Sequence, residues 1–83
     1  VHLMAHYTID TKGLLCPMPV IRLQDRAETL QPGDQLEVLS SDPGALNDIP
    51  AWCRINGHSV LKKGQEGREV RVVVELGNGT FSS

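Results

Sequence analysis

The chain has 83 residues, which allows one domain with a thin hydrophobic core. Apolar residues make up 40% of the sequence and charged residues 22%, a composition typical of globular proteins and not of disordered or fibrous ones. The formal net charge is −2, from eight Lys and Arg against ten Asp and Glu, so the chain lacks the basic excess that nucleic-acid binding requires. We therefore expect no direct nucleic-acid partner.

The sequence predicts neither a membrane partner nor a signal peptide, because no apolar run approaches the roughly 18 residues of a membrane span. Two cysteines without a framework of spacings favour a reducing compartment, and we expect a cytoplasmic protein. Residues 1–3 precede Met4 and are interpreted as left over from expression. A single domain is expected over 4–77, followed by a mobile tail over 78–83.

The first predicted elements are a short strand over 5–10 and a helix that follows a loop. The helix is predicted to begin at Cys16, with Pro17 at its first position, where the missing N–H of proline costs nothing. It carries an apolar stripe with helical spacing, formed by Val20, Leu23, Ala27 and Leu30. The Pro-Gly pair at 32–33 is expected to end this segment.

A second strand is predicted over 35–40, and a second helix follows it. Because proline is tolerated in the first turn of a helix, Pro50 places the regular start at Asp48, with 45–47 as a separate turn. Gly57 is well suited to end this helix.

Two further strands are predicted over 58–63 and 70–76, joined by a hairpin loop at 64–67. The order is then βαβαββ. With only two helices available, both are expected to cover the same face of the sheet. The predicted fold is an α/β (α+β) two-layer sandwich with a mixed four-stranded sheet and two helices on one face. The strand order is left open.

The candidate site is Cys16 with its neighbours Pro17, Met18 and Pro19. The start of a helix offers unpaired N–H groups and a partial positive charge, which favour a thiolate. The two prolines stiffen the turn. We therefore expect an exposed, fixed and easily ionised sulfur at Cys16.

The segment Gly-Leu-Leu-Cys-Pro-Met-Pro over 13–19 resembles the Cys-Pro-x-Pro signature of the TusA/SirA-like sulfur carriers. The resemblance extends over about 9–76. It includes several further short motifs, namely Asp10, Asp42-Pro43, Asp48-Ile49-Pro50, Trp52-Cys53 and Gly57-His58.

The resemblance implies a sulfur relay and the same βαβαββ sandwich. In this family a cysteine desulfurase or rhodanese-like donor passes sulfane sulfur to the cysteine that corresponds to Cys16. The persulfide then hands its sulfur to an acceptor such as a DsrE-like or Tus-type relay protein, for tRNA thiolation, cofactor assembly or sulfur oxidation. The resemblance implies a sulfurtransferase-type carrier, not an autonomous multi-turnover enzyme. It also implies no cofactor and no metal, and a monomer that forms transient complexes.

Two alternatives remain open, in which Cys16 serves thiol-redox chemistry or a regulatory interaction without sulfur transfer. Cys-Pro-x-Pro lacks the second cysteine of a Cys-x-x-Cys oxidoreductase, which disfavours a local dithiol. Cys53 lies on the apolar stripe of the second predicted helix and is interpreted as a packing residue.

Charged side chains near the motif have two readings. These side chains are Lys12, Arg22 and Arg26. They could stabilise a thiolate or help to dock a partner, or they could simply form a solvated face. His58 is interpreted as a structural residue after a helix-ending glycine. Asp10 and Asp42 are interpreted as turn and cap residues.

Overall fold

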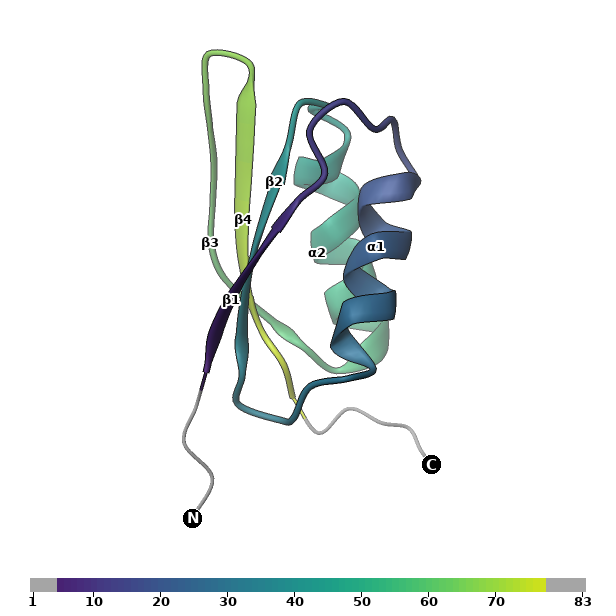
Figure 1. The fold of residues 1–83 in the computed structure, drawn as a ribbon, viewed down its shortest axis with the longest axis vertical. Helices are drawn as coiled ribbons and strands as arrows, with labels where there is room; N and C mark the ends of the chain where they lie inside the picture. The colour runs from purple at the N-terminus through teal and green to yellow at the C-terminus, as the bar shows by residue number, and fades with distance from the viewer. Residues whose placement is uncertain (1–4, 78–83) are drawn as a thin grey trace.

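A computed structural model describes residues 5–77, which form one α+β sandwich (Figure 1). The elements are β1 (His6–Asp10), α1 (Met18–Ala27), β2 (Gln35–Ser40), α2 (Ala45–Asn56), β3 (Ser59–Glu66) and β4 (Glu69–Glu75). Both helices cover the same face of the sheet. The predicted two-layer fold is therefore confirmed, and β2 has its predicted bounds. The predictions for 1–3 and for the tail over 78–83 lie outside the described residues.

The four strands lie in the order β1-β2-β4-β3, with β1 parallel to β2 and the other two pairs antiparallel. Because β1 and β2 are parallel neighbours, their carboxyl ends lie at the same edge of the sheet. The loop that follows β1 and the turn that follows β2 meet there, at the upper end of Figure 1. No helix within residues 5–77 is long and apolar enough to cross a membrane.

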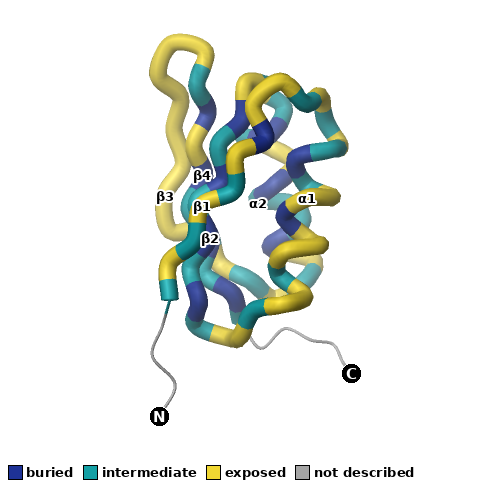
Figure 2. The backbone as a smooth tube through the Cα atoms, in the orientation of Figure 1, coloured by how far each residue is buried: buried dark blue, intermediate teal, exposed yellow. Residues whose placement is uncertain are grey.

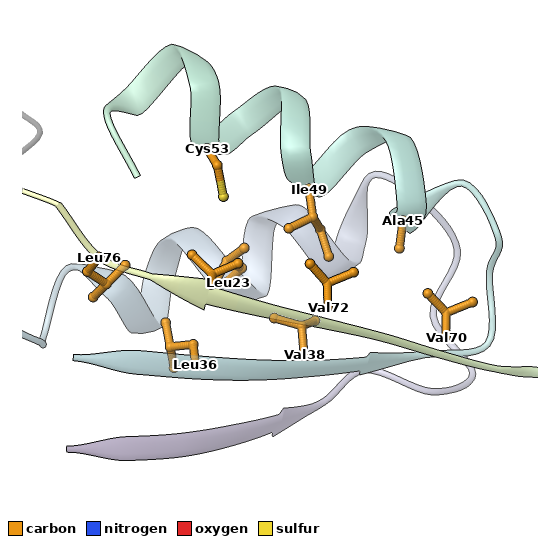
Figure 3. Packing of buried hydrophobic residues seen from close by; sticks show 10 residues of the cluster. Leu23, Leu36, Val38, Ala45, Ile49, Cys53, Val70, Val72 and Leu76 are labelled. Carbon is orange, nitrogen blue, oxygen red and sulfur yellow. The ribbon is translucent and has the colours of Figure 1, made fainter. Parts of the chain in front are cut away.

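The core lies between the sheet and the helices (Figures 2 and 3). Alternate residues of β2 and β4 point toward the helices, as the period of two in a strand requires. The buried hydrophobic residues of the core are aliphatic apart from one cysteine: Leu23, Leu36, Val38, Ala45, Ile49, Cys53, Val70, Val72, Val74 and Leu76. By contrast, β3 is exposed along most of its length.

The predicted start of α2 at Asp48 is wrong, because the helix already begins at Ala45 and contains Pro50 in its interior. The N-cap residue is Gly44, whose N–H donates to Oδ1 of Asp42 in the preceding turn at 2.9 Å. Ala45 is fully buried and packs in the same core cluster as the later apolar residues of α2. Burial of this first turn outweighs the one helical hydrogen bond that the missing N–H of proline removes.

The ends of several other elements also differ from prediction. The expected hairpin loop over 64–67 is wrong, because β3 runs to Glu66 and its last residues pair with the start of β4. A two-residue turn remains, in which Gly67 has a φ of 62°, a conformation that glycine adopts readily. Helix α1 begins at Met18, two residues after the predicted Cys16.

Ile49 and Ile55 of α2 offer a matched pair for testing the core. We expect Ile49→Ala to lower the free energy of unfolding by about 2–5 kcal/mol, because the side chain is fully buried. Ile55 is 79% exposed, so Ile55→Ala should change it by less than about 0.5 kcal/mol. Urea denaturation followed by circular dichroism measures both, and equal losses would contradict the described packing of α2.

Candidate functional site at Cys16

The loop between β1 and α1 is tied to the end of β2 by hydrogen bonds. Thr11 donates to the carbonyl of Leu39 twice, from its N–H at 2.8 Å and from Oγ1 at 2.5 Å. Gly13 N then donates to Ser41 Oγ at 2.8 Å. The loop therefore has a defined path over the carboxyl ends of β1 and β2. That path delivers Cys16 to the start of α2.

The carboxylate of Asp42 joins the two segments at this point. Its Oδ2 accepts the N–H of Cys16 at 2.9 Å, while its Oδ1 accepts the N–H of Gly44 at 2.9 Å. These two bonds hold the pKa of Asp42 below its usual range. The interpretation of Asp42 as a turn residue is confirmed, whereas its interpretation as a cap is wrong, because Gly44 is the N-cap of α2 and no side chain caps that helix. The bond to Cys16 was not predicted. Asp10 is likewise a turn residue, since its Oδ1 accepts the N–H of Lys12 at 3.0 Å.

The sulfur of Cys16 lies against the first turn of α2. A Cβ placed on Gly44 would approach Cys16 Sγ to 3.3 Å, so the absence of a side chain at this position leaves room for the sulfur. Asp48 follows Gly44 by four residues in the helix, and such residues share a helix face. The thiol is consequently within hydrogen-bonding reach of the carboxylates of Asp48 and Asp42.

The expectation of an easily ionised Cys16 is wrong. Partial burial, then the hydrogen bond and negative charge of Asp48, together with Asp42, raise the pKa of the thiol to about 12. The side chain is half-buried and packs against the edge of the core, so it is also less exposed than predicted. The resting site therefore holds a protonated thiol.

The expected stabilisation by free N–H groups of α1 is missing for a geometric reason. Pro17, not Cys16, is the N-cap residue, and Met18 N donates to Leu15 O at 2.9 Å. The next two available donors, Val20 N and Ile21 N, both donate to Pro17 O, at 3.0 and 3.1 Å. The N–H donors of the first turn of α1 are therefore bonded to nearby main-chain carbonyls. Burial and the carboxylates of Asp48 and Asp42 set the charge state of the sulfur instead.

On the side of its own loop, Cys16 is flanked by apolar residues. Leu15 is 74% exposed, and Pro17 is exposed as well. Met18 is half-buried, and Pro19 is buried beneath the turn. The prolines and Met18 therefore lie where the motif places them, but their environments differ. An approaching partner would meet Leu15 and Pro17 next to the sulfur.

Two of the three basic residues proposed to flank the site have partners elsewhere. Lys12 lies 3.7 Å from a carboxylate oxygen of Glu69, and the guanidinium of Arg26 lies 5.1 Å from the ring centre of Tyr7. Arg22 is exposed on α1. Among the described residues, the groups that act electrostatically on the Cys16 thiol are acidic.

Cys53 and His58 have structural surroundings. Cys53 is 1% exposed within the core, which confirms its interpretation as a packing residue, and burial raises its pKa to about 11. His58 stacks against Trp52 with ring centres 4.7 Å apart, and its Nδ1 accepts the N–H of Gly77 at 3.0 Å. Burial lowers the pKa of His58. No cluster of three or more potential metal ligands occurs within 5–77.

The charge state of Cys16 can be tested by its reaction with iodoacetamide, which attacks thiolates, in a Cys53→Ser protein. Because the neighbouring carboxylates oppose ionisation, the rate should keep rising toward about pH 12 instead of levelling off near the ordinary value of 9.0. Quenching the alkylation at a series of times and measuring the intact mass gives the reaction rate at each pH. A plateau at or below pH 9 would show that the carboxylates do not control the thiol.

The bridge made by Asp42 predicts a specific acid sensitivity. Since the folded-state pKa of Asp42 is lowered, its contribution to stability is present at neutral pH and is lost as pH falls below about 4. The unfolding temperature of the parent protein should therefore fall more steeply in this range than that of Asp42→Asn. Asp25→Asn, at an exposed position of α1, serves as the charge control and should follow the parent.

Comparisons with known proteins agree on one family. The family model described as Sulfurtransferase TusA matches residues 7–76. Two relatives come from Bacillus subtilis (strain 168), and they are named "Putative sulfur carrier protein YrkI" and "Putative sulfur carrier protein YrkF". The first is 39% identical over 69 residues, which are 83% of this chain and 92% of the relative. The second is 37% identical over 79 residues, or 95% of this chain, but the match spans only 42% of that longer protein.

A solved structure supports the same fold. The SirA-like protein from Desulfitobacterium hafniense superposes with a TM-score of 0.74 and 24% identity, covering 87% of this chain and 99% of that one. At this identity the likeness concerns the fold, while the matches in sequence define the family. The chain belongs to the TusA sulfurtransferase family.

Proposed function

We propose that the protein is a sulfur carrier in which Cys16 accepts sulfane sulfur as a persulfide and relays it to an acceptor protein. Family membership supports sulfur transfer in general. The observation that carries the assignment to Cys16 is its position: a half-buried thiol whose N–H is fixed by Asp42, bordered by the exposed Leu15 and Pro17. Pro19, buried beneath the turn, supports this arrangement.

Sulfur transfer requires that a partner's sulfur can approach Cys16 Sγ in line with the S–S bond that forms or breaks. Sulfane sulfur moves when a thiol attacks the outer sulfur of a persulfide in line with its S–S bond. A cysteine in a short loop, ahead of a helix and beside exposed apolar side chains, meets this requirement. Cys53 does not, because the core encloses it.

The redox alternative gains less support. A Cys16–Cys53 disulfide would need a thiol that is 1% exposed in the core to leave its packing. Both cysteines are free thiols in the described chain. We therefore rank sulfur relay above thiol-redox sensing.

The proposed partners follow from the role as a carrier. A cysteine desulfurase or rhodanese-like protein would load Cys16, and a DsrE-like or Tus-type relay protein would unload it, in the cytoplasm, where thiols stay reduced. Transient complexes of a monomer would suffice. Lys12, Arg22 and Arg26 are exposed and could contact acidic surfaces of such partners. Thiolation of tRNA, cofactor assembly and sulfur oxidation are the candidate destinations.

Intact mass spectrometry after incubation with a persulfide donor tests the assignment. The parent protein and Cys53→Ser should each gain one sulfur atom that dithiothreitol removes, whereas Cys16→Ser should gain none. Loading that persists in Cys16→Ser, or that disappears in Cys53→Ser with the fold intact, would contradict the proposal.

A further inference from the structure

The strand β3 forms an open edge of the sheet. It is the last strand in the order β1-β2-β4-β3, and only β4 pairs with it. All residues of β3 are exposed except Val60, which is half-buried (Figure 2). Within residues 5–77, no main-chain group of β3 bonds to a segment other than β4. The N–H and C=O groups on the outer side of β3 are therefore open to pairing with another strand.

Two adjacent lysines lie in the middle of this edge. Lys62 is opposite Val73 of β4 and Lys63 is opposite Val72, so the two side chains point to opposite faces of the sheet. Both lysines are exposed, and neither forms an ion pair within residues 5–77. The acidic residue of β3, Glu66, is at the end of the strand. A strand that pairs with β3 would therefore meet positive charge on both of its faces.

Two hollows in the surface border the same pair of lysines. One lies along the hairpin of β3 and β4 and includes Glu69 and Arg71. The other lies between β3 and α2 and includes Pro50. Glu69 and Arg71 already pair with each other, because Arg71 Nη2 lies 3.5 Å from Glu69 Oε1. The lysines are thus the charges that a ligand along β3 would have to match.

Charge on an edge strand selects the strands that can pair with it. Opposite charges that face each other on neighbouring strands stabilise the pair, and like charges destabilise it. Lysines on an edge therefore oppose pairing between copies of the same chain. The register shift between Val60 and Lys62 also makes β3 irregular, which disfavours a long contact with a second copy. An acidic strand is free of the charge repulsion and gains from both lysines.

We propose that β3 is a docking edge for an extended acidic segment of a partner protein, which adds a fifth strand to the sheet and places carboxylates beside Lys62 and Lys63. Main-chain hydrogen bonds supply the binding in such an arrangement, and the side chains supply the selectivity. The β3–β4 hairpin and the loop after β1 both extend toward the upper end of Figure 1, so the segment would lie near the end of the molecule that carries Cys16. The inference does not depend on sulfur transfer.

An NMR titration of the ¹⁵N-labelled protein tests the docking edge. The probe is an octapeptide with blocked ends, Thr-Thr-Val-Glu-Glu-Val-Thr-Thr, and the comparison peptide has Lys-Lys in place of Glu-Glu. The acidic peptide should cause saturable shifts centred on the amides of β3, with a Kd below about 1 mM. The basic peptide should cause none, because its charges repel Lys62 and Lys63.

Charge-reversal variants complete the test. The double variant Lys62→Glu and Lys63→Glu should bind the acidic peptide at least about tenfold more weakly and should bind the basic peptide instead. Arg54→Glu reverses an exposed cation of α2 and should bind the acidic peptide as the parent does. The ¹⁵N spectrum of each variant shows whether its fold is intact. Absence of saturable shifts, equal binding of the two peptides, or shifts centred outside β3 would overturn the inference and leave the proposed function of Cys16 unaffected.

Discussion

The hydrogen bonds of one carboxylate organise the site. Asp42 accepts the N–H of Cys16 with one oxygen and the N–H of Gly44 with the other, at 2.9 Å each. The first bond fixes the loop that carries the cysteine, and the second fixes the turn that leads into the helix bordering its sulfur. Because both segments follow parallel neighbouring strands, a single short side chain can bridge them. Without this bridge, the sulfur would lose its fixed position relative to α2.

The surroundings of Cys16 also explain why its resting thiol is protonated. The N–H donors of the first turn of α1 are used by Leu15 and Pro17, so nothing there stabilises a thiolate. Partial burial and the negative charges of Asp48 and Asp42 instead favour the thiol, which lowers its reactivity toward alkylation and oxidation.

Much of the fold followed from sequence patterns, since alternation in β2 and β4 and the stripe containing Leu23 each bury one face. The start of α2 could not be predicted in this way. The local sequence places Pro50 in the first turn of a helix, whereas the burial of Ala45 extends the helix by three residues toward its N-terminus. The charge of Cys16 was missed for a tertiary reason. Helix-start chemistry predicts a low pKa, whereas the contacts with Asp42 and Asp48 depend on β1 lying beside β2, and the strand order was not predicted.

The most direct measurement of the central claim follows the sulfur itself. Protein loaded with radiolabelled sulfane sulfur would be treated with cyanide, which converts a persulfide's outer sulfur to thiocyanate. The account predicts that the label leaves as thiocyanate, that Cys16 returns as a free thiol, and that Cys53 never carries label. Label that resists cyanide, or that is shared with Cys53, would contradict the assignment of Cys16 as a sulfur carrier.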